Sequence, residues 1–91
     1  MTSKAFQEYA TLEILRFISD FGIEGVVERS LMFDVQVGAS INLCLLQSLL
    51  HRLLADRYIL RWRDYDGWAH YAVSKRGRLF LESQGSAYLS E

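Results

Sequence analysis

The chain has 91 residues, of which 51% are hydrophobic, and its formal net charge is −1. This length and composition exclude intrinsic disorder and predict one domain, residues 1–91, with a single core. One cysteine and two histidines exclude an intramolecular disulfide and suggest no metal set, so we expect neither metal nor cofactor. No apolar run exceeds the four residues 43–46. We therefore expect no membrane span or signal peptide, and a cytoplasmic protein.

The charges are segregated along the chain. Residues 1–34 hold three basic and six acidic side chains, a net charge of −3, whereas residues 51–78 hold seven basic and three acidic ones, a net charge of +4. The second segment can therefore form a local basic face. The high apolar content of so small a domain also suggests a partner surface, such as that of a homodimer.

Residues 4–21 are predicted to form the first helix, which Thr2 or Ser3 can cap and Gly22 can end. Leu12 and Leu15 fall outside its main apolar arc and are our candidates for a dimer seam. The main arc contains Phe6, Ala10, Ile14, Phe17, Ile18 and Phe21.

A short connector, 22–25, could contribute one or two strand residues before a second helix over 26–34. Residues 35–41 are interpreted as the turn between two helices, with Ser40 or Asn42 as the N-cap of the next. The third helix, 42–57, has an amphipathic pattern. Its polar half carries Cys44, Gln47, Ser48, His51, Arg52 and Ala55.

The period then changes from 3.6 to 2, and residues 58–63 and 68–73 are predicted to pair as a hairpin around a turn at 64–67. Both a two-residue and a four-residue loop predict the same two faces. A slip of one residue would exchange them and bury two arginines, so we favour this register. One face would pack on the helices through Leu60, Trp62, Ala69, Tyr71 and Val73, and the other would present Arg61, Arg63, Trp68 and His70, with Tyr65 near the tip.

Ser74 is predicted to cap a last helix over 75–84, which Gly85 would end. Beyond it, residues 86–91 would be either frayed or docked through Tyr88 and Leu89, which we add to the candidate dimer interface.

Two motifs resemble the winged helix-turn-helix domain of small MarR-, ArsR- and PadR-like transcription regulators. Leu49-Leu50-His51-Arg52-Leu53-Leu54-Ala55-Asp56-Arg57-Tyr58-Ile59 is similar to the end of their recognition helix, and Tyr71-Ala72-Val73-Ser74-Lys75-Arg76-Gly77-Arg78-Leu79 to the exit from their wing. The likeness covers roughly residues 8–84. It implies an α+β, mostly helical fold with three helices, a two-stranded wing and a C-terminal helix. Arg57 departs from the glycine usual at that position.

The resemblance implies a transcriptional regulator that binds double-stranded DNA as a homodimer, with the third helix in the major groove. Gln47, Ser48 and His51 are then candidates for base contacts, and Arg52 for a phosphate or a guanine. The wing residues Arg61, Arg63, Tyr65, Trp68 and His70 would contact the backbone or the minor groove. Lys75 and Arg76 could contact phosphates at the start of the last helix.

Each of these sets has an ordinary structural alternative. The helix face could be solvated, the wing arginines could pair with Asp64 and Asp66, and the basic turn could be free in solvent. Outward aromatic residues beside arginines also occur at protein interfaces. A winged-helix protein-interaction module, a phage or accessory protein that binds a host regulator or complex, is therefore the alternative function. No catalytic motif is present, and we do not expect an enzyme.

Overall fold

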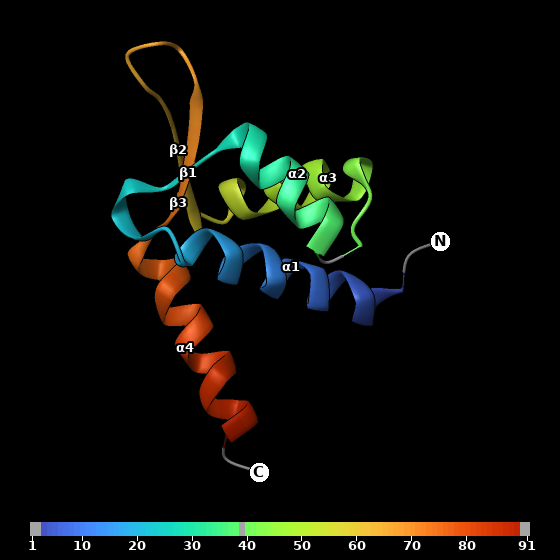
Figure 1. Ribbon diagram of the computed structural model, residues 1–91. Helices are drawn as coiled ribbons and strands as arrows, with labels where there is room; N and C mark the ends of the chain where they lie inside the picture. Colours follow the sequence, from blue (N-terminus) through green and yellow to red (C-terminus); the bar gives the residue numbers. More distant parts are fainter. Residues whose placement is uncertain (1–2, 39, 90–91) are drawn as a thin grey trace.

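The computed structural model describes residues 3–38 and 40–89. In these ranges four α-helices pack beside and below a three-stranded sheet, whose β2–β3 hairpin projects beyond the helices (Figure 1). The predicted α+β, mostly helical class is thereby confirmed. The elements are α1 (Lys4–Ser19), the 3-10 turn η1 (Gly22–Glu24), β1 (Val26–Val27), α2 (Glu28–Gly38), α3 (Leu43–Ala55), β2 (Ile59–Arg63), β3 (Ala69–Val73) and α4 (Lys75–Leu89).

Helix α1 begins at the predicted cap, because the hydroxyl of Ser3 accepts a hydrogen bond from Phe6 N at 3.1 Å. It packs against α2, α4 and β3, so more than one of its sides is buried. Leu15 is consequently 0% exposed and belongs to the core. The prediction that Leu15 lines a dimer seam is wrong, since a residue inside the chain's own core cannot reach a partner.

The second helix begins later and extends further than its sequence pattern predicts. Val26 and Val27 form β1 and pair antiparallel with Tyr71 and His70 of β3. Helix α2 then extends over residues 35–38 of the segment 35–41 that we interpreted as a turn, and Val35 is buried against the core. The β-branched character of this segment favoured a turn, but burial of one apolar face stabilises the helix instead.

Helix α3 has the predicted N-cap, because the side chain of Asn42 accepts a hydrogen bond from Leu45 N at 2.9 Å. Its other end closes with Tyr58 N donating to Leu53 O at 3.0 Å and Arg57 N donating to Leu54 O at 3.1 Å. This pair of bonds is a Schellman motif, which needs a left-handed residue. Arg57 supplies it with a φ of 63°, so an arginine adopts the conformation usually left to glycine.

The hairpin differs from the predicted register by one residue. Leu60 is paired with Ala72 and Trp62 with His70, whereas Arg61 is paired with Tyr71. The cause lies in the loop. There Asp64 N donates a hydrogen bond to Trp68 O, and Gly67 forms a bulge with a φ of 86°. That bulge adds one residue to the loop, and an odd count exchanges the two faces of the strands. Leu60 and Trp62 therefore lie on the outer face, and both are exposed.

The base of the hairpin joins α3 to α4 by close contacts. Ser74 Oγ donates to Arg57 O at 2.6 Å and accepts from Gly77 N at 3.0 Å, which confirms Ser74 as the cap of α4. A Cβ at Gly77 would collide with the backbone oxygen of Tyr58 and lie 2.7 Å from Val73 Cγ1. The first turn of α4 therefore needs a hydroxyl at position 74 to cap it and a glycine at position 77 to let it pack against Tyr58.

Helix α4 continues through Gly85 to Leu89, so the predicted end at Gly85 is wrong. The side chains of Tyr88 and Leu89 lie outside the described residues. Among the described helices, none combines the length and apolar character needed to cross a membrane. The buried core is formed by apolar residues of α1, α2, α3 and the sheet, among them Ile14, Leu31, Leu46, Leu49 and Ile59, and the partly buried Phe80 and Leu81 of α4 pack against it.

Candidate nucleic-acid interface

The exposed arc of α3 carries the predicted base-contacting residues. Leu46, Leu49, Leu50 and Leu53 are buried, and the opposite side presents Ser48 and His51 at its centre. Gln47 and Arg52 lie on opposite flanks of this arc, roughly 140° apart at 3.6 residues per turn. Ser48 and His51 therefore occupy the middle of the exposed face, which Gln47 borders on one side and Arg52 on the other.

A groove of about 410 Å³ runs between α2, α3 and the wing. Its rim is polar and its floor apolar, which suits a ligand with both characters. Gln47 and His51 of α3 meet Arg61 of β2 in this groove, so the helix and the inner face of the wing form one surface. The groove is lined by Glu28, Met32, Gln47, Leu50, His51, Leu54, Arg61 and Tyr71.

Arg61 is held at two points inside this groove. Its Nε donates to the Tyr71 hydroxyl at 3.2 Å, and its Nη2 lies 3.6 Å from Glu28 Oε2. The hydrogen bond to Tyr71 raises the pKa of Arg61 above its ordinary value, and the negative charge of Glu28 contributes in the same direction. Burial raises the pKa of the Tyr71 hydroxyl, which is therefore neutral and available as the acceptor.

The tip of the wing is organised by Asp64. Its Oδ1 accepts from the backbone N–H groups of Asp66 and Trp68, both at 2.9 Å, and its Oδ2 lies 2.7 Å from His70 Nε2. The hydrogen bond from His70 lowers the pKa of the Asp64 carboxyl, and the bond from Trp68 N adds to the effect. Tyr65 projects from this tip fully exposed, and Arg63 donates to Gly67 O at 2.8 Å.

Trp68 and His70 lie on the outer face of the sheet and not beside the arginines, which corrects the predicted wing face. His70 stacks on Trp62 at a centroid distance of 5.6 Å, and the guanidinium of Arg29 lies 4.8 Å from the centre of the Trp68 ring. Trp68 and His70 lie on the outer face for the same reason that the register differs, because the bulge at Gly67 places Trp62 and His70 opposite each other. The wing arginines Arg61 and Arg63 therefore lie on the opposite face of the sheet from Trp62 and Trp68.

Lys75 and Arg76 lie at the base of the hairpin, where the guanidinium of Arg76 stacks over Tyr58 at 5.1 Å. Strands β2 and β3 each have five residues, so roughly 17 Å separates this base from the tip at Tyr65. These two basic residues are thus not brought together with the tip of the wing.

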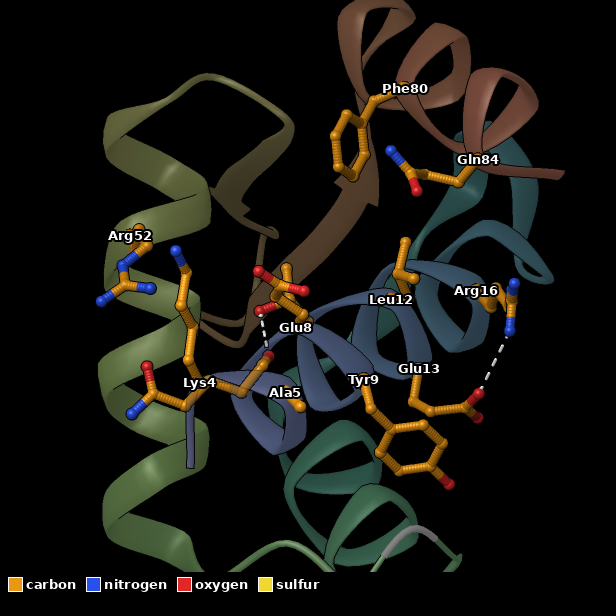
Figure 2. A pocket seen from close by; sticks show the side chains of 12 residues that line it. Lys4, Ala5, Glu8, Tyr9, Leu12, Glu13, Arg16, Arg52, Phe80 and Gln84 are labelled. Carbon is orange, nitrogen blue, oxygen red and sulfur yellow. Dashed lines mark hydrogen bonds and ion pairs between the residues drawn. The ribbon is translucent and has the colours of Figure 1, made fainter. Parts of the chain in front are cut away.

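Arg52 borders a larger cavity of about 920 Å³ on the other side of α3, between α1 and α4. In Figure 2, Arg52 and Lys4 lie on one side of this cavity, and Phe80 and Gln84 on the other. Leu12, a predicted dimer residue, projects into it between these groups and is half-buried. The ion pair between Arg16 and Glu13, at 3.2 Å, lies along its edge.

Three residues of these surfaces escaped the sequence-based interpretation. Glu28 and Arg29 were counted only among the charges of residues 1–34. Tyr71 was predicted to pack on the helices, and no role was predicted for its hydroxyl. The pairing of β1 with β3 brings Glu28 and Arg29 to the wing strand that carries Tyr71, and a two-residue strand such as β1 gives no periodic signal. The one available signal was Gly67, because a glycine at the third position of a hairpin loop is typical of a bulge.

Comparisons with known proteins connect this architecture to two solved structures. A transcriptional regulator from Clostridium thermocellum, Cth-833, superposes with a TM-score of 0.72 over 97% of this chain and 87% of its own, at 17% identity. SSV1 F-93 superposes with a TM-score of 0.70 over 89% of this chain and 87% of its own, at 15% identity. No family model and no curated protein sequence matches. The chain has the winged helix-turn-helix fold, and that prediction is confirmed.

Proposed function

We propose that this protein is a transcriptional regulator that binds double-stranded DNA, with α3 in the major groove and the wing on the adjacent backbone. The observation that carries the proposal is the shared groove, where Gln47 and His51 of α3 face the same side as the wing residue Arg61. Gln47 offers the donor and acceptor pair that suits adenine, and His51 and Ser48 can each hydrogen-bond a base edge. The fold shared with a protein described as a transcriptional regulator supports the same function.

Basic residues stand on both flanks of α3, as a helix inserted between two phosphate backbones requires. The wing supplies Arg63 on one side, next to the exposed ring of Tyr65. Arg52 and Lys4 border the other side. Each of these cations can neutralise a phosphate, which adds affinity without sequence preference and makes binding depend on salt.

The test is selection of bound sequences from a random duplex pool, followed by titration of the selected duplex at several salt concentrations. We expect a defined consensus and an affinity that falls linearly with salt on a double logarithmic scale. Gln47→Ala should relax the consensus by roughly 1–3 kcal/mol at one position, whereas Arg63→Gln should weaken all sequences alike. A flat salt dependence, or a pool that returns no consensus, would exclude sequence-specific DNA binding.

The larger cavity supports assembly as a homodimer. Leu12 and Phe80 line the part of it away from Lys4 and Arg52, together with Glu13 and Arg16 of α1, a mixture that a two-fold partner can complement. Sedimentation of the wild-type chain should give the mass of a dimer. Leu12→Glu should give the mass of a monomer with an unchanged circular dichroism spectrum, and dimeric mass in this variant would place the interface elsewhere.

The outer face of the sheet favours a second candidate function, that of a protein-interaction module. Leu60 and Trp68 are 53% and 50% exposed there, and Ile23 of η1 is 88% exposed. Exposed apolar groups that form one patch mark a site of protein–protein interaction. Leu60→Glu separates the two functions, because it should abolish capture of a protein partner and leave affinity for the selected duplex unchanged.

A further inference from the structure

The ion pair in the shared groove joins three separate segments of the chain. Glu28 is the first residue of α2, Arg61 lies in β2 and Tyr71 lies in β3. The backbone fixes all three, since Val26 is paired with Tyr71 and Tyr71 with Arg61. Glu28 begins α2 directly after β1 and lines the groove together with Gln47 and His51 of α3.

Glu28 and Tyr71 compete with DNA for the charge of Arg61. Tyr71 is 4% exposed, so its hydroxyl has a fixed position. Glu28 lies in the first turn of α2, where negative charge is favourable. A phosphate that reached Arg61 would have to displace this carboxylate at 3.6 Å or bind beside it, against its negative charge.

Arg63, on the same strand and the same face, is in a different electrostatic environment. Its Nη1 donates to the neutral carbonyl of Gly67 at 2.8 Å. Within the described residues no carboxylate lies within ion-pair distance of Arg63, whereas Arg61 has Glu28. Two neighbouring wing arginines are therefore unequal, with the charge of Arg63 free for a phosphate and that of Arg61 compensated.

We propose that Glu28 is a specificity-determining residue of the DNA-binding surface, which holds Arg61 as a support for the wing and keeps it from acting as a phosphate contact. This inference rests on the proposed function. With Arg61 tied to α2, the spacing between the wing and α3 is set before DNA arrives, and attraction to any sequence is reduced by about one phosphate contact. Base contacts from Gln47 and His51 then account for a larger share of the binding free energy.

The experiment is a double-mutant cycle on the full chain, read as the slope of log affinity against log salt with the selected duplex and with a random-sequence duplex. In the wild-type background, Arg61→Gln should leave the slope unchanged. Glu28→Gln should steepen it by about 0.9, and Arg61→Gln added to Glu28→Gln should remove that increase. Affinity for the random duplex should rise roughly threefold to fivefold in Glu28→Gln, which lowers the ratio of specific to random binding.

Two matched controls separate this effect from simple loss of a negative charge. Glu24→Gln removes an exposed acid from the neighbouring turn η1 and should leave the slope unchanged. Arg63→Gln should lower the slope by about 0.9 with or without Glu28. Thermal unfolding of each variant checks the fold, and Gln at position 28 preserves the shape of the side chain.

The outcomes distinguish this inference from the proposed function. If wild-type protein shows no salt-dependent affinity for duplex DNA, the proposed function fails and the inference fails with it. If wild type binds DNA but Arg61→Gln alone lowers its slope by about 0.9, Arg61 is an ordinary phosphate contact and only the inference is overturned. The same holds if Glu28→Gln and Glu24→Gln change the slope equally.

Discussion

The base and the tip of the wing are held by different kinds of contact. At the base, the chain leaving α3 touches the first turn of α4 so closely that Gly77 has no room for a side chain, and Ser74 bonds both segments. At the tip, the exposed carboxylate of Asp64 gathers two backbone amides and the ring of His70. Packing therefore fixes where the wing starts, and polar contacts that water can replace shape its end.

This difference suggests a division of roles. Substitutions at the base should reduce the stability of the whole chain, because they separate α3 from α4. Substitutions at the tip should leave the fold intact and change what the wing can bind, since few core contacts depend on the tip.

The largest expected effect is that of Gly77→Ala. The added methyl group would collide with the backbone of Tyr58, which cannot move without disturbing the end of α3. We expect a loss of roughly 2–4 kcal/mol in the free energy of unfolding, measured by urea denaturation. Gly38→Ala is the control, because a Cβ there meets nothing within 4 Å, and it should be neutral or slightly stabilising. Equal stability of the two variants would contradict the close contact between Gly77 and the backbone of Tyr58.

A smaller loss is expected for Ser74→Ala. The hydroxyl caps α4 through Gly77 N and donates to Arg57 O, so its removal leaves two backbone groups without their partner. The cost should be about 1–2 kcal/mol in the same denaturation experiment. Ser74→Thr keeps the hydroxyl and should recover most of this loss. A Thr variant no more stable than Ala would show that the hydroxyl contributes little.

The base was largely predictable from the sequence, and the tip was not. Ser74 was identified because a cap depends on a residue three positions away, which the sequence shows directly. The faces of the hairpin depended on whether the loop had an odd or an even length, and the single bulge at Gly67 reversed them. We favoured the other register because burying arginines is costly, but Arg61 and Arg63 remain exposed on the inner face, and Arg61 also has Glu28 as a partner.

Two further failures have the same origin in tertiary structure. Glu28 and Arg61 are 33 positions apart and meet only because β1 pairs with β3 (Figure 1). Leu15 was placed outside the apolar arc of α1, but that helix is covered by α2, α4 and β3. A single arc describes a helix buried on one side, so the sequence pattern underestimates the core of a central helix.

Arg57→Gly tests the base in the opposite direction. Arg57 holds a left-handed conformation that costs an arginine more than a glycine, although glycine loses more entropy on folding. We expect a net gain of roughly 0.5–1 kcal/mol in the free energy of unfolding, with the Schellman bonds to Leu53 and Leu54 unchanged. Arg57→Ala, which keeps the strain and shortens the side chain, should give no gain. A destabilised glycine variant would mean that the Arg57 side chain itself stabilises the connection between α3 and β2.

The smallest effect is expected at the tip, as a dependence on pH. The folded pKa of Asp64 is lowered from its ordinary value of 3.8, because His70 and the backbone N–H of Trp68 hydrogen-bond the carboxylate. Its contribution to the order of the tip is therefore fully present above pH 3.8 and is lost as the pH falls through the lower, folded pKa. Amide resonances of Asp66 and Trp68 should report this titration with a midpoint below 3.8, while those of α3 stay constant. Asp64→Asn retains an acceptor oxygen for the two amides but cannot titrate, so the transition should vanish in that variant. A midpoint at or above 3.8 would mean that the ionised carboxylate does not hold the tip. The base and the tip would then differ only in how closely their residues pack.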